Sequence, residues 1–394
     1  MKEFGFLNIF GAQIFGETEL MELYRNNLLF DFYAARKKGG EKELFELIEQ
    51  FPGCSKGILV EKLEEIKKLG TMKLENEITQ VRKNVLRILA LMLTGTCQMD
   101  CQICYVDRKK SEEEIEWGET FQILEQARQM GAKTIYTSGI GEPTLDDRFW
   151  KIAQYAKENS MEWVFFTNGL TIDEKFAQKL REYPVNIWVK FWATEPELFF
   201  EMTRPLMGLE RFVRHFCEVG FKDKKIFIPK SLKILLDYFS KERIGIQTVG
   251  AKINFGQVME IILPFAFENG LKTYVEPIIH SGRYAFGDYW DLNSEQEEMI
   301  KPYYVRQSCT RRVYTAIVDN EGILRPAQAI GGKELELIGI EKKEMRVKEN
   351  NLEELRFNHQ RHRAKLADLR WRAGCMCDRF AGDKNYQGKL KVKN

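Results

Sequence analysis

Three cysteines, Cys97, Cys101 and Cys104, stand within eight residues of one another in the segment TGTCQMDCQICY. Thiolates are the protein ligands of iron–sulfur clusters, and the spacing Cys-x3-Cys-x2-Cys allows three of them to wrap one cubane. A full set would be four, so three leave one iron open to a cofactor or a substrate, by the logic that separates catalytic from closed metal sites. The alternatives are chance clustering or a zinc site, which usually shows paired Cys-x2-Cys units and a nearby fourth ligand.

The cysteine segment follows a short apolar run at residues 86–93, which predicts a buried parallel strand, and it ends in the aromatic Tyr105. Together these features resemble the signature of the radical S-adenosylmethionine (SAM) superfamily. The resemblance implies that the open iron of a [4Fe-4S] cluster chelates the amine and carboxylate of SAM. It also implies that the reduced cluster delivers one electron, that the sulfonium cleaves, and that a 5′-deoxyadenosyl radical abstracts hydrogen from a substrate. The cofactors supply this chemistry, and the protein supplies position and exclusion of solvent.

Two later segments end in motifs that are similar to those of the same superfamily. SGIGEP at residues 138–143 resembles Gly-Gly-Glu-Pro with Ile140 interposed, and TNG at residues 167–169 resembles Thr-Asn-Gly. Glycine lets a backbone approach a ligand, Glu142 would accept from the ammonium of SAM, and Asn168 offers a donor and an acceptor. A plain loop and an Asn-Gly turn are the alternatives. The cofactor contacts predicted in these segments and the cysteine loop are Tyr105, Ser138, Gly139, Gly141, Glu142, Thr167 and Asn168.

Three polar residues farther along match the superfamily by position: Lys190, Arg204 and Asn254. The resemblance implies that Lys190 and Arg204 hold the carboxylate of SAM and that Asn254 lies near its ribose. A cation on an apolar strand is costly unless it is paired, which favours a functional Lys190, whereas a surface ion pair explains Arg204 equally well. Glu276 and Arg283 are weaker candidates for substrate contacts, with ordinary loop polarity as the alternative. The sequence identifies no catalytic side chain.

Strand-like and helix-like segments alternate between residues 85 and 290. The expected strands are 86–93, 134–137, 163–166, 185–191, 245–249 and 273–275, and the expected helices are 118–130, 147–158, 172–181, 208–219 and 256–269. Such alternation indicates βαβ units with a parallel sheet and right-handed crossovers. We therefore predict an α/β fold, a partial (β/α)6 barrel, whose ligands lie at the carboxyl ends of the strands.

Two further domains are predicted, one before and one after the barrel of residues 85–290 in the chain. Residues 1–84 are charged and helical in pattern, with a helix-turn-helix over 42–70 that is compatible with a winged helix. Residues 291–394 begin with a hairpin pattern, in which 314–318 and 323–324 flank the turn Asp319-Asn320-Glu321-Gly322. This C-terminal segment resembles the SPASM and twitch domains, which carry auxiliary clusters.

The C-terminal resemblance is incomplete. Cys309, twelve residues, Gly322 and four residues match the opening of the SPASM motif, but Ala327 stands where the motif has cysteine. Cys375 and Cys377 are spaced Cys-x-Cys instead of Cys-x2-Cys. Three interpretations stay open: a second cubane on Cys309, Cys375 and Cys377, a lost cluster whose fold only caps the barrel, or a structural zinc.

Composition narrows the class of protein. The 394 residues are 44% hydrophobic and 30% charged with a net charge of +2, so nucleic acid and membrane surfaces are not the expected partners. The N-terminal residues lack a basic start followed by a long apolar run and no stretch of about 18 apolar residues occurs, so a cytoplasmic location is expected. Clustered cysteines in a reducing compartment favour metal over disulfides.

We therefore expect a radical SAM enzyme whose subclass, as oxidoreductase, isomerase or peptide-modifying enzyme, stays open. One substrate hypothesis is a ribosomally synthesised peptide, which would make the protein a maturase that captures the leader peptide as an added strand. The other is a small molecule such as a sugar, a nucleoside or a cofactor precursor. A reductase, ferredoxin or flavodoxin is the expected electron donor. A non-catalytic iron–sulfur sensor with a DNA-binding helix-turn-helix is the alternative outside enzymology.

Overall fold

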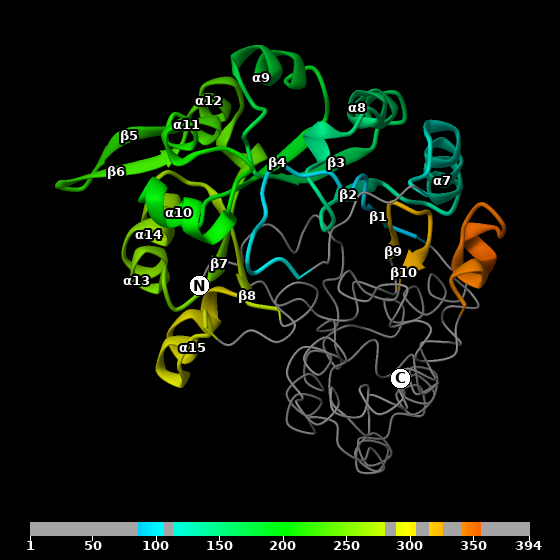
Figure 1. Ribbon diagram of the computed structural model, residues 1–394. Coiled ribbons are helices and arrows are strands. Elements are labelled where there is room, and N and C mark those ends of the chain that lie inside the picture. The colour runs from blue at the N-terminus through cyan, green and yellow to red at the C-terminus, as the bar shows by residue number, and fades with distance from the viewer. Residues whose placement is uncertain (1–85, 106–112, 280–288, 305–314, 326–340, 356–394) are drawn as a thin grey trace, which may run out of the picture.

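A curved, mostly parallel sheet forms the centre of the molecule (Figure 1). The structure is a computed structural model that describes residues 86–105, 113–279, 289–304, 315–325 and 341–355. Eight strands follow the order β10-β9-β1-β2-β3-β4-β7-β8, and only the β9–β10 pair is antiparallel. The strands are β1 (Ile88–Leu91), β2 (Thr134–Thr137), β3 (Glu162–Thr167), β4 (Val185–Lys190), β7 (Ile244–Gly250), β8 (Lys272–Pro277), β9 (Thr315–Val318) and β10 (Leu324–Arg325). The six expected strands are thus confirmed as one parallel sheet.

Helices cover the convex side of this sheet (Figure 1). They are α7 (Trp117–Gln129), α8 (Phe149–Glu158), α9 (Glu174–Leu180), α12 (Lys230–Tyr238), and a continuous helical run of α13 (Phe255–Gln257), the π-helical η3 (Val258–Ile262) and α14 (Leu263–Glu268). Alternate strand residues face this layer: Trp163 and Phe165 of β3 lie 4.7 and 5.3 Å from the ring of Phe149 on α8. The outer core therefore comes from the period-two pattern of the strands meeting apolar helix faces.

The concave side of the sheet carries an aromatic layer. Phe166 of β3 stacks on Trp188 of β4 with ring centroids 5.7 Å apart, and both meet Tyr274 of β8 edge-on. Gly245 of β7 makes room for the indole, because a Cβ there would lie 2.4 Å from the Trp188 ring. This layer fills the barrel interior as a packed floor, so a ligand site must lie above it, toward the carboxyl ends of the strands.

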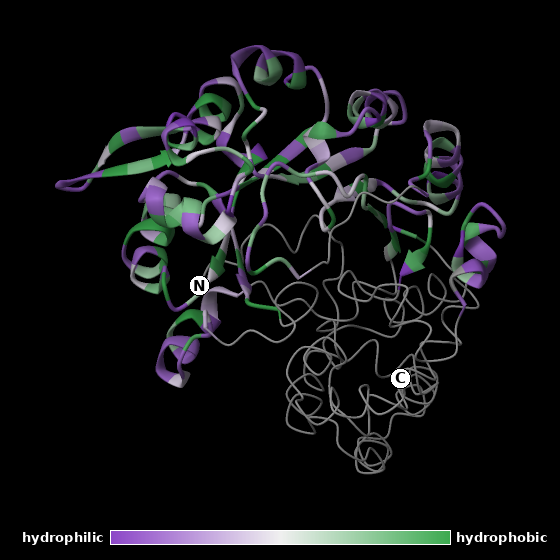
Figure 2. Ribbon diagram, viewed as in Figure 1, coloured by the Kyte–Doolittle hydropathy of each residue, from purple (hydrophilic) through white to green (hydrophobic). Residues whose placement is uncertain are grey.

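One expected helix is wrong over most of its length. The predicted helix 208–219 is observed as the short α11 (Leu209–Val213), after which the chain turns into a hairpin of β5 (Phe216–Phe221) and β6 (Lys224–Pro229). Alternating apolar positions and β-branched residues in these strands favour extended structure over helix. The hairpin is hydrophobic along its length and hydrophilic at its tip (Figure 2). The helix α10 (Pro196–Thr203), which begins with proline at its first position, precedes it and was not anticipated.

The C-terminal hairpin is confirmed, and it belongs to the main sheet. β9 pairs in parallel with β1, so the sheet continues beyond the domain boundary expected at residue 290. The remaining described elements are α15 (Ser294–Ile300) and the 3-10 turns η1 (Pro143–Leu145), η2 (Lys241–Arg243), η5 (Lys301–Tyr303) and η7 (Lys342–Met345). No helix among the described residues is long and apolar enough to cross a membrane. The helix-turn-helix predicted in residues 1–84, Cys309, Ala327, Cys375 and Cys377 lie outside the described residues.

Candidate active site

The three clustered cysteines lie in the loop that follows β1. Cys101 is buried, and Cys97 and Cys104 are partly exposed. The loop is fastened to the end of α10, because the backbone N–H of Asp100 donates to Thr203 at 2.9 Å and the N–H of Leu206 donates to Gln98 at 2.7 Å. These bonds hold the cysteine loop across the carboxyl end of the barrel, where parallel α/β folds place their ligands.

The loop is also joined to the end of β2. The backbone N–H of Glu142 donates to the carbonyl of Thr96 at 2.8 Å. Gly141 has a φ of +65°, and a Cβ at this position would lie 2.0 Å from the carbonyl oxygen of Thr94. Only glycine fits such a position, because it combines a left-handed backbone with direct backbone-to-backbone contact. Gly139 is close packed too, with a φ of +112°, and a Cβ there would lie 3.0 Å from the side chain of Met92.

Glu142 is 1% exposed and joins the ends of β2 and β3. Its Oε1 accepts from the hydroxyls of Thr167 at 2.6 Å and Thr144 at 2.8 Å, and its Oε2 accepts from the backbone N–H of Asn168 at 2.7 Å. A carboxylate has about four acceptor positions, so Oε2 keeps capacity for one more donor. The buried charge is thus held in a fixed orientation with one side able to accept from an ammonium group.

Asn168 connects β3 to the cysteine loop. Its Oδ1 accepts from the backbone N–H of Leu170 at 3.0 Å, which fixes the amide, and its Nδ2 donates to Oε1 of Gln98 at 3.0 Å. The same Nδ2 lies 3.8 Å from the sulfur of Cys97. The amide predicted to contact the cofactor therefore stands directly beside the first cysteine.

Lys190 places a cation among the same groups. Burial lowers the pKa of its ammonium, but the nearby thiols of Cys101, Cys97 and Cys104 and the Glu142 carboxylate raise it more, so the pKa lies above its usual value. The Nζ also lies 5.4 Å from the ring centroid of Trp192. The three thiols and the Glu142 carboxylate thus act together on the ammonium at the end of β4.

Tyr105 and Ser138 form the next part of the rim. Burial raises the pKa of the Tyr105 phenol well above its usual value, Glu276 adds to the rise, and a hydrogen bond with Ser138 opposes it. Glu276 at the end of β8 accepts from Nε2 of Gln247 at 2.6 Å, and Oε1 of Gln247 accepts from the indole N–H of Trp192 at 2.9 Å. Gln247 was missed by the sequence reasoning. The feature that could have identified it is an amide side chain in a fully buried strand, two residues after Gly245, the glycine that faces Trp188.

Two further predicted contacts, Asn254 and Arg204, are held by hydrogen bonds with neighbouring backbone. Asn254 is 0% exposed, and its amide is used by the backbone: Oδ1 accepts from the Ala251 N–H at 2.9 Å and Nδ2 donates to the carbonyls of Trp192 and Val249. It joins the ends of β4 and β7, and both N–H groups of its amide are used in these bonds. Arg204 is exposed at the left-handed end of α10, and its carbonyl accepts from Asp100. Arg283 lies outside the described residues.

The donor set fits an iron–sulfur cluster with a ligand beside it. Among the residues that the structure describes, no three Cys, His, Asp or Glu side chains come close enough to ligate a single metal ion. A cubane makes a different demand, because each thiolate binds a different iron of the cluster. Three soft thiolate ligands, an ammonium, an oriented carboxylate and an amide are the groups that would hold a cubane and an amino acid chelating its open iron.

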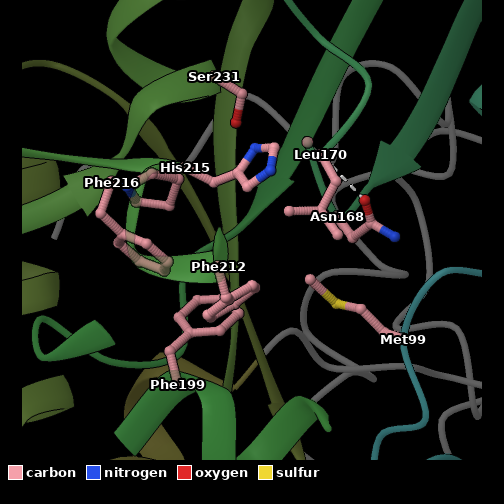
Figure 3. A pocket seen from close by; sticks show the side chains of 10 residues that line it. Met99, Asn168, Leu170, Phe199, Phe212, His215, Phe216 and Ser231 are labelled. Carbon is pink, nitrogen blue, oxygen red and sulfur yellow. Dashed lines mark hydrogen bonds between the residues drawn. The ribbon is translucent and has the colours of Figure 1, made fainter. Parts of the chain in front are cut away.

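A small cavity opens beside this site (Figure 3). It has an empty volume of about 240 Å³, part of it open to solvent, and Met99 and Asn168 form the wall nearest to the cysteine loop. Phe199, Phe212, Phe216, His215, Leu170 and Ser231 line the rest with Gly169 and Pro229. Burial and the charges of Arg211 and Lys230 lower the pKa of His215. The cavity therefore offers aromatic walls and a neutral imidazole at neutral pH.

Comparison with known proteins agrees with this geometry. Residues 91–230 match the radical SAM superfamily. The chain is 32% identical over 112 residues to Fe-coproporphyrin III synthase of Methanosarcina barkeri, which covers 28% of each protein. It is 28% identical over 104 residues to the tungsten-containing aldehyde ferredoxin oxidoreductase cofactor-modifying protein of Pyrococcus furiosus, covering 26% of this chain and 29% of that protein. The chain thus spans less than a third of the length of either relative.

Solved structures share the fold. SuiB of Streptococcus suis bound to the precursor peptide SuiA matches with a TM-score of 0.50 and 14% identity, over 68% of this chain and 65% of that chain. The enzyme anSMEcpe with bound AdoMet matches with a TM-score of 0.51 and 12% identity, over 70% and 79%. The cysteine loop after β1, Glu142 and Asn168 all fall inside residues 91–230, so the part of the chain that forms this site is the part that matches the radical SAM superfamily.

Proposed function

We propose that this protein is a radical SAM enzyme with a [4Fe-4S] cluster on Cys97, Cys101 and Cys104. When bound, the reduced cluster would supply one electron to the sulfonium of SAM, whose cleavage to methionine would yield a 5′-deoxyadenosyl radical that abstracts hydrogen from a substrate. The observation that carries the proposal is the position of Asn168, whose backbone N–H donates to Glu142 at 2.7 Å and whose Nδ2 lies 3.8 Å from the sulfur of Cys97. The sequence motifs alone do not place these groups around one point.

The residues of the chain divide the recognition of SAM between them. Lys190 provides a charge-assisted donor for the carboxylate of the cofactor, and Oε2 of Glu142 provides an acceptor for its ammonium. Asn168 holds the Cys97 side of the loop and presents its amide toward the same space. Tyr105 with Ser138 closes the rim near Cys104. The aromatic floor of Phe166, Trp188 and Tyr274 keeps solvent from the lower side.

Binding of SAM to the anaerobically reconstituted full chain tests this assignment. Lys190→Met should weaken SAM binding by about 10- to 150-fold, since a charge-assisted bond to a carboxylate contributes about 1.5 to 3 kcal/mol, while the iron content stays that of the wild type. Lys233→Met is the matched control, because Lys233 pairs with Asp237 on the exposed face of α12. Unchanged affinity in Lys190→Met would remove Lys190 from the cofactor site.

For the substrate we propose a peptide, which would make the protein a maturase of ribosomally synthesised peptides. Support comes from the fold shared with SuiB, whose structure holds a precursor peptide, over two thirds of this chain. The second candidate is a small molecule. It is supported by relatives named Fe-coproporphyrin III synthase and probable GTP 3′,8-cyclase, the latter 24% identical over 167 residues.

Fractionated cell extract separates the two candidates. The readout is the rate of 5′-deoxyadenosine release by the reconstituted full chain when each size fraction is added. A peptide substrate predicts stimulation by the peptide-sized fraction that is lost after protease treatment. A small-molecule substrate predicts protease-resistant stimulation by the low-mass fraction. A sensor without catalytic activity predicts no release with any fraction, which would contradict the enzymatic proposal.

A further inference from the structure

A carboxylate outside the recognised motifs holds the start of the cysteine loop. We define the leading arm as residues 93–96, which join β1 to Cys97. Oε1 of Glu114 accepts from the backbone N–H of Gly95 at 2.7 Å, and Oε2 accepts from the hydroxyl of Thr94 at 3.1 Å. The Thr94 oxygen in turn accepts from the N–H of Thr96 at 3.1 Å. Glu114 therefore sets the backbone of the leading arm immediately before Cys97.

The same arm sets the position of Glu142. The carbonyl of Thr96 accepts from the Glu142 N–H at 2.8 Å, and Gly141 lies against the carbonyls of Thr94 and Thr96. A shift of the arm would thus move Cys97 and Glu142 together. Arg148 supports the arm from below, because its guanidinium donates to the carbonyls of Leu93 and Ile115. Cys97, which is proposed to ligate the cluster, and Glu142, which is proposed to bind SAM, therefore both depend on the position of the leading arm.

The C-terminal hairpin holds Glu114 from its other side. Nδ2 of Asn320, in the turn between β9 and β10, donates to Oε1 of Glu114 at 3.0 Å, and its carbonyl accepts from the Ile115 N–H at 2.9 Å. The turn is itself fixed, since Asp319 accepts from the backbone N–H groups of Glu321 and Ile323 and pairs with Arg325 at 2.6 Å. Asp319 and Asn320 are 1% and 3% exposed.

We propose that Glu114 and Asn320 are positioning residues for the cluster, through which the turn of the β9–β10 hairpin fixes the leading arm and Cys97. This inference rests on the proposed function, because it assumes that Cys97 ligates iron. It gives the C-terminal hairpin a function in the barrel that is independent of any cluster on the later cysteines. Partners of metal ligands typically change metal affinity by 10- to 100-fold when they are removed.

The test measures how fast the reconstituted full chain loses iron to a chelator under anaerobic conditions. Glu114→Ala and Asn320→Ala should each lose iron about tenfold faster than the wild type. Glu114→Gln should recover most of the difference, because its amide oxygen can still accept from Gly95 and Asn320 and its NH2 group can donate to the hydroxyl oxygen of Thr94. The matched control is Glu113→Gln: the neighbouring carboxylate is 63% exposed and pairs with Arg346, so iron loss should match the wild type.

A second control separates positioning from general loss of stability. Asn269→Ala removes an amide that donates to the Phe265 carbonyl at 2.8 Å, at the opposite end of the barrel. Asn269→Ala should lower the melting temperature but leave the rate of iron loss and the electron paramagnetic resonance spectrum of the reduced cluster unchanged. Glu114→Ala should change the rate of iron loss and the spectrum. Equal iron loss in wild type, Glu114→Ala and Asn320→Ala would overturn the inference, and so would equally fast loss in Asn269→Ala. A wild type that binds no iron would instead overturn the proposed function.

Discussion

Replacing Gly141 by alanine tests how tightly the end of β2 is joined to the cysteine loop. An alanine Cβ would lie 2.0 Å from the Thr94 carbonyl oxygen and 2.6 Å from that of Thr96, and these are backbone atoms that cannot rotate away. The left-handed φ of +65° adds a second cost for any side chain.

The magnitude follows from three contributions. A left-handed backbone costs alanine about 1 kcal/mol, overpacking against fixed atoms costs about 1 to 3 kcal/mol, and losing the Glu142 N–H bond to Thr96 costs about 1 kcal/mol. Gly141→Ala should therefore lower the free energy of unfolding by about 3 to 5 kcal/mol. If the chain relieves the clash by moving the loop, the loss of stability is smaller but iron retention falls.

Urea unfolding of the iron-free chain and iron retention of the reconstituted chain are the two assays. Gly118→Ala is the control, because Gly118 lies in α7 with nothing within 4 Å of a Cβ. Alanine is the better helix former, so this variant should gain about 0.5 to 1 kcal/mol. A Gly141→Ala protein that matches the wild type in both stability and iron retention would refute the close contact between β2 and the loop.

Two further predictions concern the barrel and the cofactor site. Thr248→Val should raise the free energy of unfolding by about 1 kcal/mol in urea titrations, because the Thr248 hydroxyl is the buried side-chain polar atom without a partner among the described residues. Thr120→Val removes a hydroxyl bonded to Glu116 and Arg148 and should lower the free energy of unfolding. The opposite order of the two variants would contradict this reasoning. Asn168→Ala should leave the fold intact by circular dichroism but weaken SAM binding by about tenfold, since its amide links Cys97 and Gln98 to β3, and an unchanged dissociation constant would argue against that link.

Much of the site could be read from sequence because its groups sit in short local motifs. Cys97, Cys101 and Cys104 share one loop, and Glu142 and Asn168 directly follow buried strands, so the parallel topology alone brings them to one edge. Lys190 follows from a similar physical argument, that a cation on an apolar strand needs partners, and the thiols of the cysteine loop and Glu142 raise its pKa; its contact with SAM stays a prediction.

The features that were missed depend on contacts between distant segments. Glu114 and Asn320 are 206 residues apart, and neither belongs to a motif, so no local pattern pairs them. Asn254 was assigned to the ribose by position, but its burial and its bonds to Trp192 and Val249 can only be seen once β4 and β7 are adjacent. The predicted helix 208–219 extends past α11 into the start of β5, because apolar residues in a short segment satisfy both periods.

The proposed chemistry depends above all on whether the cysteine loop supports the cleavage of SAM. The direct measurement is 5′-deoxyadenosine released by the anaerobically reconstituted full chain with dithionite and SAM, compared with a variant in which Cys97, Cys101 and Cys104 are alanine. We expect release by the wild type and none above background by the triple variant. Equal release by both proteins, or none by a wild type that retains its iron, would contradict the assignment of the cluster to this loop.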